Sequence, residues 1–290
     1  MTTPVQTGIG FGRRSRRLSD EQTEQRMLQA AIAMVNATGL TVSLDHISFE
    51  DVIRDARVSR STVYRRWPYK DLFFSDLLKE LAKAATPAAM TGEETAVANI
   101  RRIVLEHREW LETAESRNDL VLELMRQGAV QDFETMRSST EWRTYLALHT
   151  TFLSVADDTL RSELQAALAE TERSFISRIA AAWERMVGLL GYRLRPELDT
   201  TFETFASLAS ADLRGLVMMA LATPEIATLR IRAKPFGAAQ TADWSLCGIG
   251  IASIAMTFLE PDPTVVWDEA RLAAVRRALE SDDLAQTQPA

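Results

Sequence analysis

The chain is poor in the residues that support the commonest catalytic and structural chemistries. It has one cysteine, Cys247, in 290 residues, which excludes an internal disulfide and suits a reducing compartment. Its three histidines, His46, His107 and His149, lie far apart in sequence, without metal-ligand spacing. No glycine-rich phosphate loop, G-x-S-x-G motif or C-x-x-C motif occurs. We therefore expect no metal, no cofactor and no enzyme. An all-helical enzyme with dispersed catalytic groups is the alternative that motifs leave open.

Long apolar runs are also absent. The longest uncharged stretch, 244–259, is shorter than the ~20 residues that a helix needs to cross a bilayer. The arginine-rich N-terminus lacks the apolar core of a secretion signal. These absences predict a cytoplasmic protein without a membrane segment.

Basic residues are concentrated in the N-terminal region. Residues 1–85 carry 13 Lys and Arg against 10 Asp and Glu, whereas the remainder carries 20 against 30. The net charge of −7 excludes a protein that coats nucleic acid over its whole surface. Contact with DNA is therefore expected in the N-terminal region, and the remaining chain is long enough for a larger second domain.

The segment from Ser48 to Lys70 predicts two short helices joined by a tight turn. Ser48 and Ser59 are N-cap residues for helices over 49–56 and 60–67, and a proline follows the second helix. Apolar residues recur at helical spacing and are expected to form the buried side of the pair: Val52, Ile53, Ala56, Val63 and Trp67.

The other side of the second helix carries hydroxyl and guanidinium groups. Its polar residues are Ser61 and Arg65, which point away from the buried side, Thr62 and Arg66, which flank them, and Arg60 and Tyr64, nearer the buried edge. Arginine binds guanine through two hydrogen bonds, and a helix-turn-helix presents its second helix to the major groove in this manner. A hairpin with a merely solvated polar face is the alternative. The absence of acidic residues from 58 to 70 argues against it.

Helices are expected on both sides of this pair. Ser19 and Gln22 form a capping-box pattern, which predicts a helix over 20–37 that Gly39 ends. A further helix begins at 69–71, and its apolar face is made of Phe74, Leu77, Leu78 and Leu81. The unit expected over 19–85 is a three-helix head with a longer exit helix.

The segment from Glu24 to Leu81 resembles the N-terminal DNA-binding domain of TetR-family transcriptional regulators. The resemblance rests on LQAAIAMVNATGL in the first helix and on FEDVIRDARVSRSTVYRRWPYKDLF through the helix pair. The pattern V-S-x-x-T-[VL]-Y-x-x-[FW]-x-x-K is filled in register by Val58, Ser59, Thr62, Tyr64, Trp67 and Lys70. The resemblance implies a homodimer that binds palindromic operator DNA, more often as a repressor, and is released by a small ligand.

Residue roles follow from the resemblance by position. Thr62 and Tyr64 are expected to contact the DNA backbone, Lys70 a phosphate, and Ser61 and Arg65 base edges. The full set of expected DNA-binding residues in the helix pair is Ser48, Ser59, Arg60, Ser61, Thr62, Tyr64, Arg65, Arg66 and Lys70. One departure is Arg57, in a turn position where the family usually has glycine. It either adopts a left-handed backbone or alters the turn.

Residues 1–18 are expected to form a disordered basic arm that contains Arg13, Arg14, Arg16 and Arg17. Two interpretations stay open, because both predict weaker DNA binding when the arginines are removed. The arm either attracts any polyanion or reaches the neighbouring minor groove or phosphates.

The rest of the chain predicts an all-α effector-binding and dimerisation domain over 86–283, followed by a tail over 284–290. Helices are expected at 93–115, 118–137, 140–153, 157–190 (broken or continuous), 196–222, 244–260 and 264–280. The stretch between Pro224 and Asp243 is weakly patterned, as in a long surface connection.

The resemblance also implies a dimer interface and a ligand pocket in this domain. The candidate interface helices are 196–222 and 244–260; the latter contains Gly248 and Gly250, and a core helix within one subunit is its alternative role. The candidate ligand-binding residues are Trp110, Met125, Trp142, His149, Trp183 and Met186, which favour a hydrophobic effector. A DNA-binding co-regulator without a ligand is the remaining alternative.

Overall fold

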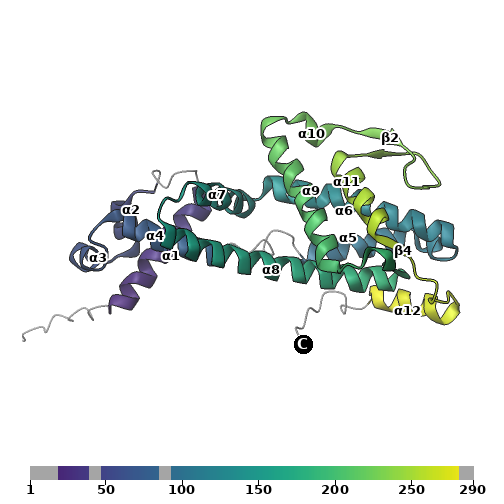
Figure 1. The fold of residues 1–290 in the computed structure, drawn as a ribbon, viewed down its shortest axis with the longest axis horizontal. Coiled ribbons are helices and arrows are strands. Elements are labelled where there is room, and N and C mark those ends of the chain that lie inside the picture. The colour runs from purple at the N-terminus through teal and green to yellow at the C-terminus, as the bar shows by residue number, and fades with distance from the viewer. Residues whose placement is uncertain (1–18, 39–46, 85–92, 281–290) are drawn as a thin grey trace, which may run out of the picture.

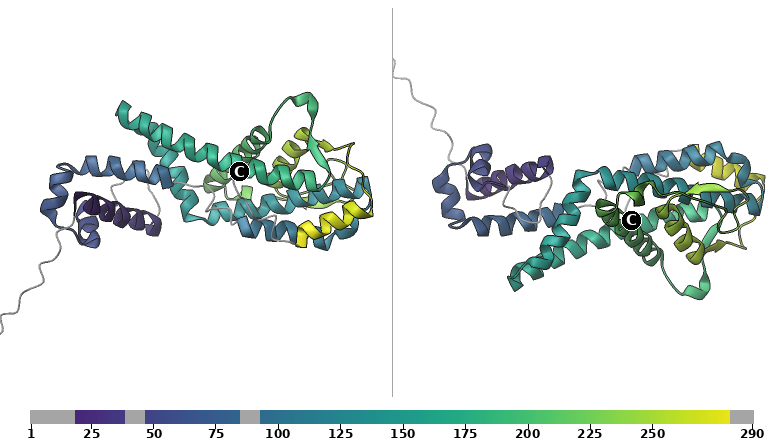
Figure 2. Two further views of the ribbon diagram at one scale, coloured as in Figure 1. Left: turned by 90° about the horizontal axis from the view of Figure 1, so that it is seen from below. Right: turned by 90° about the horizontal axis from the view of Figure 1, so that it is seen from above.

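The computed structural model of the protein describes residues 19–38, 47–84 and 93–280. This part of the chain is mostly helical and elongated, with α1–α4 at one end and most other helices at the opposite end (Figures 1 and 2). Several predictions fall outside the described residues: the basic arm with Arg13, Arg14, Arg16 and Arg17, the stop at Gly39, the boundary at 85/86 and the tail at 284–290.

The N-terminal helices begin where the sequence predicts. They are α1 (Asp20–Thr38), α2 (Phe49–Ala56), α3 (Arg60–Arg66) and α4 (Lys70–Ala84). The capping box is confirmed, because the Ser19 amide donates to Gln22 Oε1 and the Gln22 amide to Ser19 Oγ, both at 3.1 Å. Ser48 and Ser59 likewise accept the amides of Asp51 and Thr62. Side-chain caps therefore set the start of three of these helices.

The apolar side of α1–α4 forms one core. All five residues predicted for the buried side of α2 and α3 are buried: Val52, Ile53, Ala56, Val63 and Trp67. In α4 the predicted Leu77, Leu78 and Leu81 are buried and Phe74 is partly buried, whereas the fully buried Phe73 was not predicted. The indole Nε1 of Trp67 donates to Asp76 Oδ2 at 2.9 Å. This hydrogen bond fixes the C-terminal end of α3 to α4.

Arg57 adopts the left-handed conformation that glycine usually supplies. Its φ and ψ are 54° and 45°, and it ends α2 by donating its amide to Arg54 O at 3.1 Å. The next amide, of Val58, reaches Ile53 O at 3.5 Å. The turn therefore keeps the helix-ending geometry that a glycine would give, at the cost of crowding around the arginine Cβ.

The remaining helices follow the predicted order with two subdivisions. They are α5 (Glu93–Glu106), α6 (Ala114–Ser138), α7 (Thr140–Ser154), α8 (Asp158–Leu189), α9 (Phe202–Ala222), α10 (Glu225–Thr228), α11 (Leu246–Phe258) and α12 (Glu269–Glu280). The helix expected over 93–115 ends at Glu106 and is followed by a 3-10 turn, η3 (Arg108–Leu111). The helix expected over 196–222 is a 3-10 turn, η4 (Pro196–Leu198), and then α9.

Two small antiparallel sheets were not predicted. Strand β1 (Tyr192–Leu194) pairs with β4 (Leu259–Pro261), and β2 (Ile231–Ala233) pairs with β3 (Ala242–Trp244). The second sheet and α10 occupy the stretch from about Pro224 to Asp243, for which the sequence predicts a long surface connection. Its turn is held on α6, because Asp119 Oδ1 accepts the Ala239 amide at 2.7 Å. The stretch is therefore ordered around contacts with residues far away in sequence.

Helix α8 is a single, unbroken helix of 32 residues and spans much of the molecule (Figure 1). Near its N-terminal end, Leu164 and Leu168 belong to the same core as α1–α4. We call the remaining helices, α5–α12, the body. Toward the other end of α8, Trp183 and Met186 pack in the core of this body. Further contacts tie α8 to α4: Lys79 Nζ lies 2.5 Å from Glu163 Oε2, and Thr171 Oγ1 lies 3.3 Å from Ala82 O. The N-terminal helices are therefore packed onto the body through α8.

One described helix, α9, is long and apolar enough to cross a membrane. It packs against α8 and α11, with Phe205, Ala209 and Leu213 buried on one side. A core helix of a soluble protein meets the same criteria of length and composition, so α9 is weak evidence for a membrane span.

Replacing Arg57 by glycine tests the conformation of the turn. We expect Arg57→Gly to raise the free energy of unfolding by about 0.5–1 kcal/mol, because the relief of left-handed crowding exceeds the added freedom of the unfolded chain. Urea denaturation at fixed protein concentration measures the change. Arg54→Gly, three residues earlier in α2, is the control and should lower stability by about 1 kcal/mol. Equal losses in both variants would contradict the strained turn.

Candidate functional site

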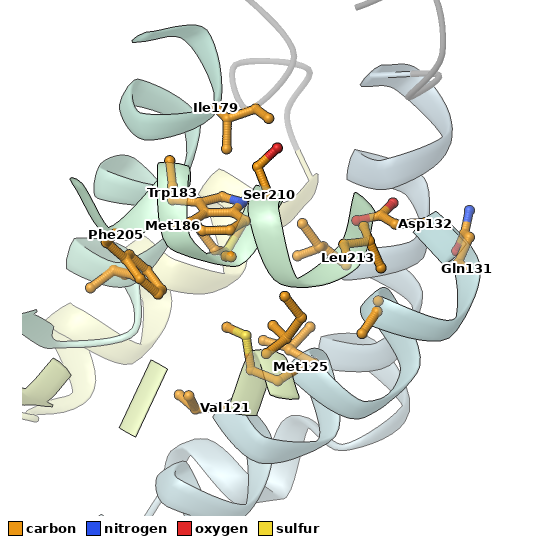
Figure 3. Close-up of a pocket in the computed structure, with 18 of the residues that line it drawn as sticks. Val121, Met125, Gln131, Asp132, Ile179, Trp183, Met186, Phe205, Ser210 and Leu213 are labelled. Atoms are coloured by element: carbon orange, nitrogen blue, oxygen red, sulfur yellow. The ribbon is translucent and has the colours of Figure 1, made fainter. Parts of the chain in front are cut away.

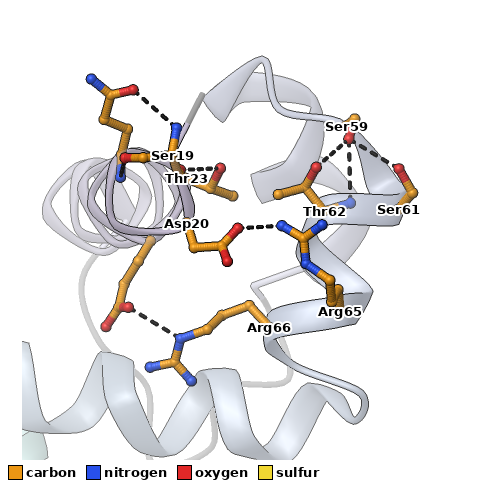
Figure 4. A network of polar contacts seen from close by, with 10 residues as sticks. Ser19, Asp20, Thr23, Ser59, Ser61, Thr62, Arg65 and Arg66 are labelled. Atoms are coloured by element: carbon orange, nitrogen blue, oxygen red, sulfur yellow. Dashed lines mark hydrogen bonds and ion pairs between the residues drawn. The ribbon is translucent and has the colours of Figure 1, made fainter. Parts of the chain in front are cut away.

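The polar side of α3 carries a cluster of hydroxyl groups at its start. Ser59 Oγ lies 3.2 Å from Ser61 Oγ and 2.7 Å from Thr62 Oγ1 (Figure 4). The Ser59 oxygen also caps the helix by accepting the Thr62 amide at 3.3 Å. Ser59 and Ser61 are exposed and Thr62 is partly exposed, so this end of α3 offers several hydrogen-bonding groups on a fixed backbone.

The arginines of α3 meet carboxylates from other helices. Arg65 pairs with Asp20 and Arg66 with Glu24, both on α1, the latter at 3.1 Å (Figure 4). Across the turn, Glu50 of α2 accepts the Tyr64 hydroxyl at 3.0 Å and lies 2.7 Å from Arg60. The sequence segment 58–70 lacks acidic residues, but folding brings these three carboxylates beside it. Sequence reasoning missed them because they lie on other helices.

These ion pairs are exposed and correspondingly weak. The Arg65 and Asp20 side chains are 54% and 65% exposed. Pairs at such positions contribute at most about 1 kcal/mol, so replacing the carboxylate by another anion costs little. They orient the guanidinium groups beside the outer side of α3 and leave them available to an anionic partner.

Lys70 is the first residue of α4 and is exposed. It makes no ion pair with another described residue. A lysine at a helix N-terminus adds its charge to the positive end of the helix dipole, which makes this position suited to an anion. Ser48 is also exposed, at the N-terminus of α2.

A cavity of about 170 Å³ lies between the helices of the body (Figure 3). Helices α6, α8 and α9 supply most of its lining, and α5, α11 and both strands of the β1–β4 sheet complete it. On α6 the lining residues Val121, Met125, Gly128, Asp132 and Met136 recur at helical spacing, so one side of this helix faces the cavity. The main apolar side chains from the other helices are Phe175, Ile179, Trp183, Met186, Phe205 and Leu213.

The six residues considered for ligand binding divide into two groups. Met125, Trp183 and Met186 line the cavity. Trp110, Trp142 and His149 lie elsewhere.

Each of these three side chains contacts residues that are not part of the cavity lining. Trp110 stacks on His107 with ring centroids 4.0 Å apart. Trp142 is fully buried against Tyr145, beneath the Arg214 guanidinium, and His149 Nδ1 bonds Tyr145 O at 2.9 Å. The resemblance placed these candidates on helices that line the pocket in that family. Here Trp110 lies on η3 and Trp142 and His149 lie on α7, and neither element contributes a residue to the cavity lining.

Among the residues that the structure describes, Asp132 is the one Asp, Glu, Lys, Arg or His in the cavity lining. It makes no hydrogen bond or ion pair with the residues that the structure describes. Removal from water disfavours its charged form and raises the pKa of its carboxyl from 3.8 to about 6. Sequence reasoning missed this residue, although an acidic side chain within an apolar stripe of α6 is a visible signal.

Polar residues of the lining besides Asp132 are Asn99, Gln131, Tyr192 and Ser210, and Ser210 lies on α9. Its hydroxyl oxygen is buried and has no hydrogen-bond partner among the described residues (Figure 3). Buried polar groups in folded proteins are nearly always paired, so the Ser210 hydroxyl is an exception. It shares an apolar cavity with the Asp132 carboxyl, which is partly buried and also has no partner among the described residues. Such a combination is typical of a small-molecule binding site.

The chain matches no protein-family model, and neither a curated protein nor a solved structure is similar enough to match it. Within 19–38, 47–84 and 93–280, no group of three or more His, Cys, Asp or Glu is placed to hold a metal ion. Function is therefore inferred from the exposed side of α3 and from the cavity.

Replacing Asp132 by asparagine tests the isolation of this carboxyl. Because its pKa is raised in the folded protein, Asp132 lowers stability progressively as the pH rises from about 4 to about 6. The unfolding free energy of Asp132→Asn minus that of wild type should therefore be on the order of 2 kcal/mol larger at pH 7.5 than at pH 4.5. Urea denaturation at several pH values measures this.

The matched control is Glu134→Gln, two residues along α6, whose side chain is exposed and paired with Arg137. It should show no comparable gain over this pH range. An identical pH dependence of wild type and Asp132→Asn would mean that the carboxyl is solvated.

Proposed function

We propose that this protein is a DNA-binding transcriptional regulator, a ligand-responsive repressor of the TetR type that binds a palindromic operator as a homodimer. It acts in the cytoplasm and is not an enzyme. The observation that carries the proposal is the exposed side of α3, which presents hydroxyl and guanidinium groups next to a tight turn and a capped helix. In this proposal α2 and α3 form a helix-turn-helix, and α1–α4 form its DNA-reading head.

The chemistry of α3 supports base readout. Ser61 and Arg65 lie on the exposed side, whereas Val63 and Trp67 anchor the opposite side in the core. A rigidly packed helix with short hydroxyls and long guanidinium groups outward fits the donor and acceptor pattern of a major groove. Lys70 and Tyr64, exposed at either side of this surface, would contact the DNA backbone.

The cavity favours a ligand-responsive regulator over a ligand-independent co-regulator. A co-regulator has no need of an apolar cavity with unsatisfied polar groups, whereas an effector site requires one. The same cavity is a poor candidate for an enzyme active site, because among the described residues its lining offers Asp132 alone as a carboxylate and no Lys, Arg or His to share acid–base work with it.

Helix α8 supplies the route from ligand to DNA. Trp183 and Met186 line the cavity, and Leu164 lies in the core of the N-terminal helices on the same helix. A ligand that fits one position of α8 better shifts the population of head orientations. Because two heads must meet successive major grooves about 34 Å apart, a modest shift breaks the fit.

The exposed side of α9 supports dimerisation. Leu208, Met218, Met219 and Leu221 are between 47% and 57% exposed, an unusual number of large apolar side chains for one helix. The small residues of α11 instead serve contacts within the subunit, since Gly248 lies against the Arg126 backbone and Gly250 against Asp212. We therefore propose α9 as the main dimer contact, with α11 behind it.

Selection of binding sites from random DNA duplexes tests the proposal. The purified protein should enrich two half-sites related by a twofold axis, with centres about one helical turn apart. Enrichment of no sequence, with equal retention of all duplexes, would contradict a sequence-reading head.

Arg65→Ala should relax sequence preference at one base pair of each half-site and cost about 1–3 kcal/mol in operator binding. Removal of the guanidinium takes away a bidentate contact but leaves the rest of α3 in place. Binding to the selected site and to all single-base variants measures the preference. The control is Arg173→Ala on α8, an exposed arginine paired with Glu170, which should leave binding unchanged. Uniform weakening on every sequence would make Arg65 a phosphate contact.

Lys70→Ala should weaken specific and nonspecific DNA alike and reduce the salt dependence of binding by about one counterion. Affinity measured over a salt series on operator and unrelated DNA gives both quantities. Lys83→Ala, also on α4 and paired with Glu80, is the matched control. An unchanged salt slope in Lys70→Ala would remove this residue from the DNA interface.

A further inference from the structure

We propose that the cavity takes a lipophilic organic monocation, an apolar body with one ammonium group held by the Asp132 carboxylate. Calling this ligand an effector rests on the proposed regulatory function, whereas its binding to the cavity does not. Binding itself concerns the body of the protein and is measured without DNA.

Charge is the first step of the argument. In the described part of the chain, the lining of the cavity contains no Lys, Arg or His beside Asp132. The Arg214 guanidinium lies over the Phe175 ring, but it is bonded to Glu172 Oε1 at 2.8 Å and to the Tyr145 hydroxyl at 3.0 Å. A carboxylate withdrawn from water without a partner is unstable, and a cationic ligand supplies the missing charge.

The apolar lining is suited to a cation with an aromatic or aliphatic body. Trp183, Phe175 and Phe205 present aromatic rings, and the faces of such rings attract an ammonium group. Met125, Met136 and Met186 add flexible, polarisable side chains that adapt to an irregular ligand. A volume of about 170 Å³ exceeds what one benzene ring needs, so a fused bicyclic body is a reasonable probe.

The same features disfavour other ligand classes. An anion would meet the Asp132 charge without a compensating cation in the lining. A neutral ligand would fill the apolar space but leave the carboxylate without a charged partner. The buried Ser210 hydroxyl, also unpaired, offers a second acceptor to an N–H group of the ligand. Both unsatisfied polar groups thus accept hydrogen bonds from a protonated amine.

Three isosteric probes test the charge preference on the full-length, DNA-free protein at pH 7.5. They are 2-(1-naphthyl)ethylammonium, neutral 2-(1-naphthyl)ethanol and anionic 1-naphthaleneacetate, measured by isothermal titration calorimetry. The ammonium should bind roughly tenfold or more tightly than the alcohol, and the acetate most weakly. Equal binding of ammonium and alcohol, preference for the acetate, or no binding of any probe would each overturn the proposal.

Variants locate the preference at the cavity. Asp132→Asn should lose the advantage of ammonium over alcohol while still binding the alcohol, and Asp132→Glu should keep the advantage. Glu134→Gln, which removes an exposed carboxylate from the same helix, should leave the preference unchanged. A preference that survives in Asp132→Asn would place the cation elsewhere and overturn the assignment.

Operator binding is measured separately on the same preparations. Loss of the charge preference with intact sequence-specific DNA binding rejects the cationic effector alone. An intact preference without sequence-specific DNA binding rejects the regulator alone.

Discussion

The continuity of α8 is the constraint on which the rest of the structure depends. This 32-residue helix, roughly 48 Å long, packs at one end on α4 and at the other lines the cavity. A single helix cannot move at one end while both cores stay unchanged, because packed interiors do not deform freely. Leu164 and Trp183 therefore lie on one continuous helix. A displacement of Trp183 at the cavity would change how α8 packs on the N-terminal helices.

Charges are arranged differently at the two ends of α8. At the N-terminal helices, Arg65 and Arg66 have carboxylate partners at the surface, where water and salt make the pairs weak and exchangeable. In the cavity, Asp132 is partly buried and has no partner among the described residues, and desolvation raises its pKa, so its charge is costly. The first arrangement is suited to a polyanion that replaces exposed carboxylates. The second is suited to a small cation that completes a buried pair.

Much of the helical architecture could be predicted from local signals. Ser19, Ser48 and Ser59 mark helix starts because a side-chain oxygen caps the first amides, and that chemistry is read directly from sequence. The two small sheets were not predicted. Strand β1 pairs with β4 across more than sixty intervening residues, which no local signal reveals. Strands β2 and β3 are close in sequence, but each has three residues and lies in a weakly patterned stretch. The cavity was located only in part. Met125 on α6 lines it, whereas Trp142 lies on α7, which contributes no lining residue. Which helices surround the cavity depends on how α6, α8 and α9 pack together, and local sequence patterns do not encode that packing.

The most direct test of the central claim, that α1–α4 read DNA sequence, is fluorescence-anisotropy binding to DNA from upstream of the protein's own gene. Scrambled DNA of equal length is the control, and both are titrated at several salt concentrations. The account predicts tight binding to the upstream DNA, with affinity that falls as salt rises, and much weaker binding to the scrambled duplex. Equal, weak binding to both duplexes would contradict it.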